Sequence, residues 1–520
     1  MFVHDSTVLW KLVSEAYSTQ VLLATSLVLL VMKLIQVIKQ EWNLPPGPWG
    51  LPIVGSMWSI KGSELHLYYQ DLAKKYGPIF SVRLGSQLCV VLSDPKQIRE
   101  VFRKEEFTGR PTNEFTNILG GYGVINIAGD LWKQQRRYLH ASFRRFGMSY
   151  FNARKDLMEK RIMDEVNSCI GYLRTIGGKP VDTSEVFAVN VSNVICGMMM
   201  SVKFSHNDVQ FIRFMNLIEE GFRLFGSLEV ANFIPTLRIL PFCFGGVVAK
   251  IEQNRAEMAE YMQEKIDDHK KTFDPGNPRD LLDMYVNDVS LAMKEGNVDR
   301  LFHGKDPDRQ IQQIMGDLFS AGMETIKSSL QWSILFMLHY PDEMKAVQEE
   351  LDEVVGRGRL PALDDISYLP ITNATLNEIL RIANIVPLGT THAPTRVIKL
   401  GKYTLPKHAQ VVPLLHYVHM NPDLWDEPEK FNPSRFISSE GKLLNPECFL
   451  PFGEGRRKCL GEVMARMEIF LFFSSILHSF DLSVPEDHPL PSLKGIAGVT
   501  LNPNAFKVCL KDRPLIGYAN

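Results

Sequence analysis

The sequence predicts a mainly α-helical fold with small β-sheets near both ends of the chain, and three observations support this class. Two short runs, Ile79–Leu84 and Leu88–Leu92, have the composition of strands. Asp306-Pro307-Asp308 is typical of a helix N-terminus. Apolar residues recur at helical spacing over much of the chain, in residues 148–173, 208–225, 246–271 and 310–338.

Composition and charge limit the class of protein. The chain has 520 residues, of which 45% are hydrophobic and 22% charged. This suffices to bury a large core and is unlike disordered protein. The net charge of −2 gives no indication of nucleic-acid binding. Because no Gly/Ser-rich or charged linker divides residues 53–520, we expect them to form a single domain.

The N-terminus predicts a membrane anchor. Residues 21–38 are apolar apart from polar positions such as Lys33, and as a helix these 18 residues would span about 27 Å. We therefore expect one anchor over residues 1–43, with Lys33 and Lys39 placing the body on the cytoplasmic side. A cleaved signal peptide and a buried helix are the alternatives. The proline-rich residues 44–52 predict a stiff hinge, because proline fixes φ.

The seven cysteines are irregularly spaced and include no C-x-x-C motif. A disulfide framework or a zinc site is therefore a poor interpretation, and a reducing compartment is the simpler one. Only Cys459 has a setting that indicates chemistry. It lies in the loop Phe-Gly-Glu-Gly-Arg-Arg-Lys-Cys-Leu-Gly, residues 452–461, before a predicted helix over 462–480. Backbone N–H groups and the dipole at a helix N-terminus stabilise a thiolate.

Other residues of this loop suit a flat anionic ligand. Gly455 and Gly461 let the backbone approach such a ligand closely, and Arg457 is placed to pair with a carboxylate. The alternative is an inert buried cysteine in a basic loop. Five positions resemble the haem-binding loop of the cytochromes P450: Phe452, Gly455, Arg457, Cys459 and Gly461. The resemblance implies the cytochrome P450 fold, with haem b held through iron by Cys459, between a long kinked helix and the cysteine-loop helix.

A second motif, Ala321-Gly322-Met323-Glu324-Thr325, lies midway along the predicted helix 310–338. Glycine inside a helix costs up to about 1 kcal/mol relative to alanine, and a threonine hydroxyl can bond the i−4 carbonyl and bend the helix. Alone, these residues indicate a kinked helix with an exposed glutamate. The resemblance implies an oxygen-binding notch at Ala321 and Gly322, a water held beside O2 by Thr325, and proton relay by Glu324.

A third motif is implied to bind the haem propionates. Trp132 and Arg136 share a helix face at i,i+4, which alone indicates an ordinary surface pair. The resemblance groups them with Arg457 and His392 around the propionates. A lone histidine has many other interpretations, so His392 depends most on the resemblance.

A fourth motif is implied to be structural. Glu378 and Arg381 are spaced i,i+3, and such a pair normally contributes about 0.2–0.5 kcal/mol on a solvated face. The resemblance adds Arg435 as a third partner. It implies a buried network that holds the segment leading to the cysteine loop.

An anionic sulfur on haem iron favours O–O cleavage, so the resemblance implies a monooxygenase that inserts one oxygen atom from O2. Electrons must come from outside, because the sequence has no flavin or nicotinamide fingerprint. The implied donor is the NADPH–cytochrome P450 reductase of the endoplasmic reticulum membrane, where we expect this chain to be anchored. Basic residues near the cysteine loop are candidate contacts for the reductase, or simply a solvated face: Lys133, Arg137, Arg144, Arg145, Arg456 and Lys458.

The segments that the family uses for substrate contacts are largely apolar, which favours a sizeable lipophilic substrate. Asn117, Thr390 and Thr391 are able to meet substrate hydroxyls. The apolar range 233–248 is a candidate for contact with the bilayer surface. The apolar candidates are Phe115, Ile118, Leu119, Phe211, Phe225, Leu318, Val386, Leu388, Ile496 and Val499.

Residues 106–111, 317–327 and 491–495 carry a closer resemblance, to the insect ecdysteroid 26-hydroxylases. It implies a steroid substrate, the moulting hormone 20-hydroxyecdysone. Oxidation at its terminal side-chain carbon, with the 26-carboxylic acid as a further product, would inactivate the hormone. Another steroid hydroxylase or a broad xenobiotic hydroxylase is the alternative within the class. From other classes, a haem sensor or hormone-binding protein without turnover and a helical scaffold without haem stay open.

Overall fold

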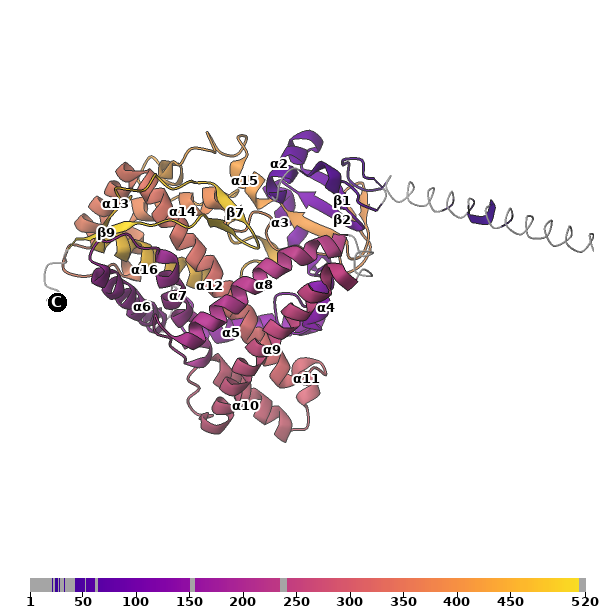
Figure 1. The fold of residues 1–520 in the computed structure, drawn as a ribbon, viewed down its shortest axis with the longest axis horizontal. Helices are drawn as coiled ribbons and strands as arrows, with labels where there is room; N and C mark the ends of the chain where they lie inside the picture. Colours follow the sequence, from indigo (N-terminus) through magenta and orange to yellow (C-terminus); the bar gives the residue numbers. More distant parts are fainter. Residues whose placement is uncertain are drawn as a thin grey trace, which may run out of the picture.

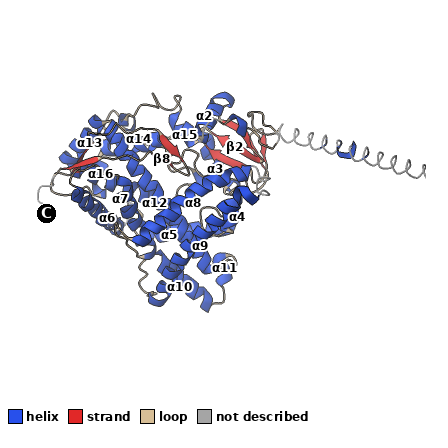
Figure 2. Ribbon diagram, viewed as in Figure 1, coloured by secondary structure: helices blue, strands red, loops and turns tan. Residues whose placement is uncertain are grey.

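A computed structural model of the chain describes residues 43–51, 53–60, 64–149, 155–233 and 241–513, with scattered positions between 21 and 32. Helices make up most of this part, and short strands form small sheets (Figure 2). The predicted class, mainly α with small β-sheets near both ends, is confirmed. The predicted anchor lies almost wholly outside the described residues. No helix of the described part is both long and apolar enough to cross a membrane.

Helices surround α12, which Figure 1 places near the middle of the molecule. The helices before it are α2 (Leu65–Tyr76), α3 (Pro95–Arg103), α4 (Glu114–Leu119), α5 (Gly129–Arg145), α6 (Lys155–Ile176), α7 (Thr183–Met200), α8 (Val209–Phe233), α9 (Pro241–Thr272), α10 (Leu281–Lys294) and α11 (Val298–Phe302). From α12 onward they are α12 (Pro307–His339), α13 (Pro341–Val354), α14 (Pro370–Ala383), α15 (Leu415–Met420) and α16 (Glu462–Ser479). Short 3-10 turns are η1 (Met57–Ser59), η2 (Glu105–Phe107), η4 (Leu363–Tyr368), η5 (Pro433–Phe436) and η6 (Gly455–Arg457).

The strands join segments that are distant in sequence. In the sheet beside α2 and α3, β2 pairs antiparallel with β1 and parallel with β5. The pairs β3–β4, β6–β9 and β7–β8 are antiparallel. Their bounds are β1 (Ile79–Leu84), β2 (Gln87–Leu92), β3 (Ile398–Leu400), β4 (Tyr403–Leu405), β5 (Gln410–Pro413), β6 (Phe480–Ser483), β7 (Gly495–Ala497), β8 (Leu501–Pro503) and β9 (Cys509–Asp512).

The long helix α12 forms where the sequence predicts it. The Asp306 side chain accepts a hydrogen bond from the N–H of Arg309 at 2.8 Å, and Pro307 occupies the first turn, where its missing N–H is harmless. From Ile311 to Met337 most side chains are buried, as expected of a central helix. Helix α7 packs along it and is buried on all sides. Because α7 has no polar face, it shows no amphipathic period, and the sequence did not predict it.

Two predicted helix ends are wrong for identifiable reasons. The helix predicted from Met148 starts too early, because the Met148 N–H bonds the Phe143 carbonyl at 3.1 Å in the turn that ends α5. Gly147 in this turn has φ of 96°, a common helix stop. The helix predicted to end at residue 225 continues to Phe233, whose carbonyl accepts the N–H of Ser86 at 2.7 Å. Contacts of this kind join distant segments, so the local spacing of apolar residues does not predict them.

The proline-rich residues 44–51 lie against strand β1. The carbonyl of Pro46 accepts the Ser81 N–H at 2.8 Å, and the carbonyl of Pro45 accepts the Ser81 hydroxyl at 2.7 Å. A Cβ on Gly47 would come within 1.7 Å of the Ser81 carbonyl oxygen, so glycine is required there. This part of the predicted hinge is therefore fixed to the body of the protein by backbone contacts.

Candidate active site

The cysteine loop turns tightly before α16. The N–H of Cys459 donates to the Phe452 carbonyl at 3.0 Å, and Gly461 precedes the first residue of α16. The Cys459 side chain is accessible, yet burial among surrounding atoms is the largest influence on its pKa, which it raises. Both hold for a sulfur that faces a space inside the protein. The Gly461 N–H and the Arg136 and Lys458 cations act in the opposite direction and favour the thiolate.

The loop glycines serve different ends. Gly455 has φ of 81°, and a Cβ there would lie 2.3 Å from the Phe102 carbonyl oxygen of α3. Its lack of a side chain is thus required by protein packing, which differs from the expected approach to a ligand. A Cβ on Gly461 would meet no atom within 4 Å, so Gly461 borders open space.

Arg457 points away from solvent into a cage of backbone oxygens. Its guanidinium donates to the carbonyl of Thr108 at 2.6 and 3.0 Å, and to the carbonyl of Ile127 at 2.5 Å. It also lies 4.0 Å from the ring centre of Trp132, a buried residue of α5. Burial, then the neighbouring Arg110 and Arg136, lower the pKa of Arg457 to about 7.

Arg110 and Arg136, both half-buried, complete a cluster of three cations with the buried Arg457. Arg110 donates to the carbonyls of Ile125 at 2.9 Å and Thr391 at 2.7 Å, and burial followed by Arg136 lowers its pKa to about 10. Arg136 donates to the Lys458 carbonyl, and burial lowers its pKa while Cys459 raises it. Among the described residues, no carboxylate pairs with any of the three.

This cluster is the test of whether the residues fit haem. Buried charges are normally paired, because an isolated one is costly in a low-dielectric interior. Three guanidinium groups without a carboxylate partner, beside an accessible cysteine sulfur, match a ligand that carries two carboxylates and a thiolate-binding metal. The fit is good: Arg457, Arg136 and Trp132 would hold the propionates, and Cys459 the iron. Sequence reasoning missed Arg110, which lies in a turn with no periodicity to mark it.

His392 lies next to this cluster. Its Nδ1 is 2.9 Å from the Phe107 carbonyl, and its ring stacks on Phe102 at 3.8 Å between centres. Burial, then Arg110, lower its pKa to about 3, so the ring is neutral. With Nδ1 donating to the Phe107 carbonyl, Nε2 is the ring nitrogen that can accept a hydrogen bond.

The motif on α12 has one accessible patch. Ala321 is exposed and Thr325 half-buried on the same face of an otherwise buried stretch. The Thr325 hydroxyl donates to the Ala321 carbonyl at 2.7 Å. A Cβ on Gly322 would lie 3.4 Å from Ile195 of α7, which is ordinary contact. Glu324 is buried rather than exposed, and its Oε2 lies 2.7 Å from the ammonium of Lys327.

Glu378, Arg381 and Arg435 form one connected network. Glu378 accepts from Arg381 at 2.7 and 2.8 Å and from Arg435 at 3.0 Å, and the side chains of Glu378 and Arg381 are fully buried. Arg381 also donates to the carbonyl of His419 at 2.6 Å. The His419 ring in turn accepts the N–H of Leu450, just before the cysteine loop, at 2.9 Å. His419 was not predicted, because nothing near it in sequence marks this role.

The side chains predicted to contact substrate form two groups, an accessible group and a group packed in the core. Ile496 and Val499 are exposed and Ile118 is half-buried, whereas Phe211 and Leu318 are packed in the core. Of the polar candidates, Asn117 and Thr390 are exposed; the Thr391 carbonyl binds Arg110. The side chains of Phe115 and Phe225 are outside the described set. The candidates of the first group are therefore the better placed to meet a substrate.

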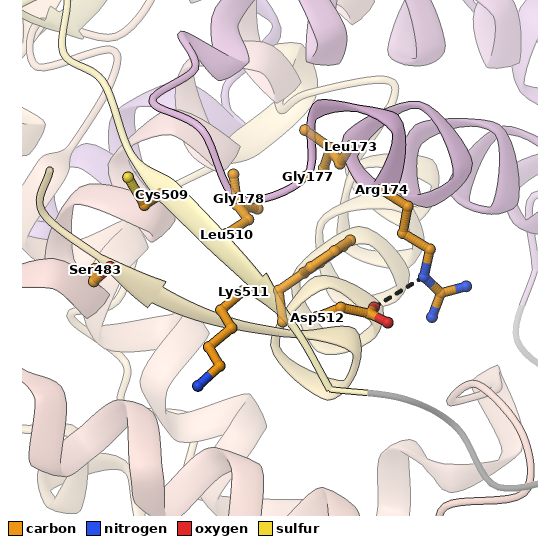
Figure 3. Close-up of a pocket in the computed structure, with 10 residues that line it drawn as sticks. Leu173, Arg174, Gly177, Gly178, Ser483, Cys509, Leu510, Lys511 and Asp512 are labelled. Atoms are coloured by element: carbon orange, nitrogen blue, oxygen red, sulfur yellow. Dashed lines mark hydrogen bonds and ion pairs between the residues drawn. The ribbon is translucent and has the colours of Figure 1, made fainter.

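Two cavities in the described part of the chain differ in their distance from these sites. A cavity of about 510 Å³ lies between the end of α6 and the β6–β9 pair, where Arg174 and Asp512 form an ion pair at 2.9 Å (Figure 3). No predicted site residue lines it. A second, open cavity of about 380 Å³ is lined by Arg110, Asn117 and Ile127. It borders the cation cluster from the solvent side.

The basic residues near the loop are partly neutralised. Lys133 pairs with Glu105, and the Lys458 ammonium lies 2.5 Å from Glu462. Arg456 donates to the Arg103 carbonyl at 2.9 Å. Further candidates on α5 are exposed: Arg137, Arg144 and Arg145. A positive face beside the cysteine loop is therefore present, weaker than a count of its residues indicates.

Comparison with known proteins agrees with this geometry. The cytochrome P450 family model matches residues 45–510. Cytochrome P450 18a1 of Drosophila melanogaster is 54% identical over 490 residues, which cover 94% of this chain and 91% of that protein. Cytochrome P450 2B19 of Mus musculus is 34% identical over 479 residues (91% and 95% covered), and cytochrome P450 2B2 of Rattus norvegicus 35% over 482 (91% and 95%). The chain therefore belongs to the cytochrome P450 family, as a monooxygenase that uses haem and O2 with electrons from NADPH through a reductase.

Proposed function

We propose that this monooxygenase hydroxylates 20-hydroxyecdysone at its terminal side-chain carbon, C26, and so inactivates the hormone. The observation that carries the proposal is the amino-acid sequence of residues 106–111, 317–327 and 491–495, which resembles that of the insect ecdysteroid 26-hydroxylases. The identity values support it, because an insect relative is 54% identical over most of the chain and the two rodent relatives only 34–35%. Further oxidation to the 26-carboxylic acid is a second product of the same chemistry.

In this proposal the chain's residues hold and orient the reactants. When bound through a thiolate, haem supplies O2 activation. Cys459 is the iron ligand, and Arg457 and Arg136 neutralise the propionates. The Thr325 hydroxyl exchanges its bond to the Ala321 carbonyl for a water beside O2, at the accessible patch of α12. Glu324 supplies protons from the buried side of the same helix.

The steroid would lie against the accessible apolar side chains. Ile118, Ile496 and Val499 offer apolar surface, which suits a fused-ring skeleton. The exposed side chains of Asn117 and Thr390 offer polar atoms for the hydroxyls that a polyhydroxylated steroid carries. Apolar walls with a few polar groups are typical of sites that fix both affinity and orientation.

The same proposal places the chain at the endoplasmic reticulum membrane. Residues 1–43 are the proposed anchor, and residues 53–520 the single catalytic domain. The proposed partner is the membrane-bound NADPH–cytochrome P450 reductase, docking at the positive face beside the cysteine loop.

The experiment is incubation of the full-length, haem-loaded chain with reductase, NADPH and 20-hydroxyecdysone, followed by mass spectrometry. We expect a product one oxygen heavier, with the new hydroxyl on C26. Cys459→Ala should abolish the product and the red-shifted Soret band of the reduced carbon monoxide complex. Cys448→Ala, a half-buried cysteine outside the loop motif, is the matched control and should retain both.

Each other outcome selects an alternative. Product from a panel of unrelated lipophilic compounds but not from the ecdysteroid would indicate a broad hydroxylase. Ecdysteroid binding without NADPH consumption would indicate a hormone-binding protein. Full activity of Cys459→Ala would overturn the site itself.

A further inference from the structure

Lys327 is a buried lysine on the oxygen-side helix α12. Its side chain is 7% exposed, and it follows Glu324 by three residues, so the two side chains lie on neighbouring positions of one helix face. The Lys327 ammonium is 2.7 Å from Glu324 Oε2, and the Glu324 side chain is equally buried. Lysine is rarely buried to this extent unless it is paired. The pair is therefore an interior ion pair, unlike the exposed i,i+3 pairs elsewhere on the chain.

The other oxygen of Glu324 is held from a different element. Oε1 accepts from the amide of Asn502 at 2.8 Å and from the hydroxyl of Thr500 at 3.2 Å, both at the β7–β8 hairpin. This hairpin also carries the exposed substrate candidates Ile496 and Val499. Glu324 is thus paired with a cation of its own helix on one side and accepts hydrogen bonds from the substrate-side hairpin on the other.

A third element reaches Lys327. Glu219 of α8 lies 3.8 Å from its ammonium, with a side chain that is 60% exposed. In the described part of the chain, Glu219 and Glu324 are the carboxylates within ion-pairing distance of Lys327. Thr500 and Asn502, the hairpin groups that face Glu324, are uncharged. The charge balance at Glu324 therefore depends on Lys327.

This arrangement separates Glu324 from Thr325. The Glu324 carboxylate is occupied by Lys327 and the hairpin, and the Thr325 hydroxyl is occupied by the Ala321 carbonyl. Glu324 can pass a proton towards water at Thr325 only after both groups change partners and the carboxylate has taken up a proton from solvent. How readily the acid changes partners is set by the strength of its bond to Lys327.

We propose that Lys327 is a positioning residue for proton supply, which holds Glu324 against the β7–β8 hairpin until substrate and O2 are in place. The proposal rests on the proposed roles of Glu324 and Thr325. A substrate that moves the hairpin tip would loosen Thr500 and Asn502 from Glu324, and so release the acid only when a reactant is present. The function would be to prevent electrons from being spent on peroxide in the absence of substrate.

The test compares variants of the full-length, haem-loaded chain with reductase. Lys327→Met removes the ammonium at similar length, Lys327→Arg keeps a cation, and Glu324→Gln removes the acid. Lys345→Met is the matched control, because Lys345 and Glu349 form an exposed i,i+4 pair on α13. For each variant we would measure product formed per NADPH consumed, across pH, with and without substrate.

In Lys327→Met we expect product per NADPH to fall several-fold and its pH profile to move, since a buried carboxylate without a counter-ion takes up a proton more easily. Lys327→Arg should restore most of the coupling, and Lys345→Met should match wild type. The double variant with Glu324→Gln should be no worse than Glu324→Gln alone, because the two residues act as a unit. Additive losses, or wild-type coupling and pH profile in Lys327→Met, would overturn the proposal.

A readout independent of turnover completes the test. Lys327→Met should show a new infrared band of a protonated carboxylic acid near neutral pH, and the band should vanish in the double variant with Glu324→Gln. If no ecdysteroid product forms with wild type, coupling is measured on a lipophilic alkoxycoumarin probe, so failure of the substrate assignment stays separate. Absence of the band in Lys327→Met would contradict the proposal whatever the substrate.

Discussion

The Nε2 atom of His419 accepts a hydrogen bond from the backbone N–H of Leu450 at 2.9 Å. The His419 carbonyl also accepts the Arg381 guanidinium, so this residue joins the buried network of α14 to the segment that enters the cysteine loop. Burial, then Arg381, lower the pKa of His419 to about 3. The ring is therefore neutral, and Nε2 keeps the lone pair that this bond needs.

Loss of the Glu378 charge, at the centre of the network, should destabilise the segment that leads into the cysteine loop. Glu378→Gln leaves Arg381 and Arg435 without a counter-charge in the interior, which typically costs about 3–5 kcal/mol. We expect a large drop in the urea midpoint and a smaller haem-loaded fraction. The exposed Glu349→Gln on α13 should change neither by much, and equal losses in the two variants would contradict the role of the network.

The half-buried His416 makes the stability of the protein depend on pH. Burial, then His66, lower the pKa of His416 to about 3, against 6.5 for the free side chain. Between these values the unfolded chain binds a proton that the folded chain does not. Stability from this group is thus constant above pH about 6.5 and falls as pH drops towards 3, by up to about 1.4 kcal/mol per pH unit.

His416→Phe should therefore move the acid-unfolding midpoint to lower pH. The Nδ1 atom of His416 is buried and has no hydrogen-bond partner among the described residues, so an apolar ring suits the site. Circular dichroism across an acid titration measures the midpoint. His488→Phe, at an exposed position, is the control, and an unchanged midpoint for both would show that His416 is not the group that titrates.

Arg110→Leu should weaken haem retention, because it removes one of the three cations of the cluster. One charge-assisted hydrogen bond contributes about 1.5–3 kcal/mol, which corresponds to a loss of affinity of about tenfold or more. Transfer of haem to a scavenging globin measures the rate of loss. Arg174→Leu removes an arginine that is paired with Asp512 and remote from the cluster, and its haem should leave at the wild-type rate.

Thr325→Ala should uncouple electron flow from product. Without the hydroxyl, the accessible patch loses the side chain proposed to hold water beside O2, so NADPH oxidation should continue while peroxide replaces product. Thr325→Ser retains a hydroxyl and should recover much of the coupling. Peroxide and product yields per NADPH are the measurement, and an unchanged ratio in Thr325→Ala would remove this residue from the proton path.

The loop glycines should respond differently to a methyl group. Gly455→Ala forces a Cβ to within 2.3 Å of the Phe102 carbonyl at positive φ, so the folded yield should fall sharply. Gly461→Ala adds its Cβ to open space and should leave the haem-free fold intact. Thermal unfolding of both distinguishes them, and similar melting temperatures would show that the loop adapts.

Local patterns could predict α12 because its cap, length and internal glycine are all written in adjacent residues. They could not predict α7, whose buried faces leave no polar stripe to mark a period. In the site, Cys459 was identifiable because five positions of one loop are fixed together. Arg110 and His419 were not, because each acquires its partners only when distant segments pack. Glu324 was named from its motif, but its contacts with Thr500 and Asn502 were not, because they span more than 170 residues.

The cluster of three arginines near Cys459 has a consequence for the life of the chain in the cell. Three like charges without counter-ions repel one another, and a dianionic tetrapyrrole relieves that repulsion on arrival. Newly made chains that meet no porphyrin should open more often at this edge and be degraded sooner. The amount of active enzyme is thereby expected to follow the iron and porphyrin supply of the tissue, in addition to any control over synthesis of the protein.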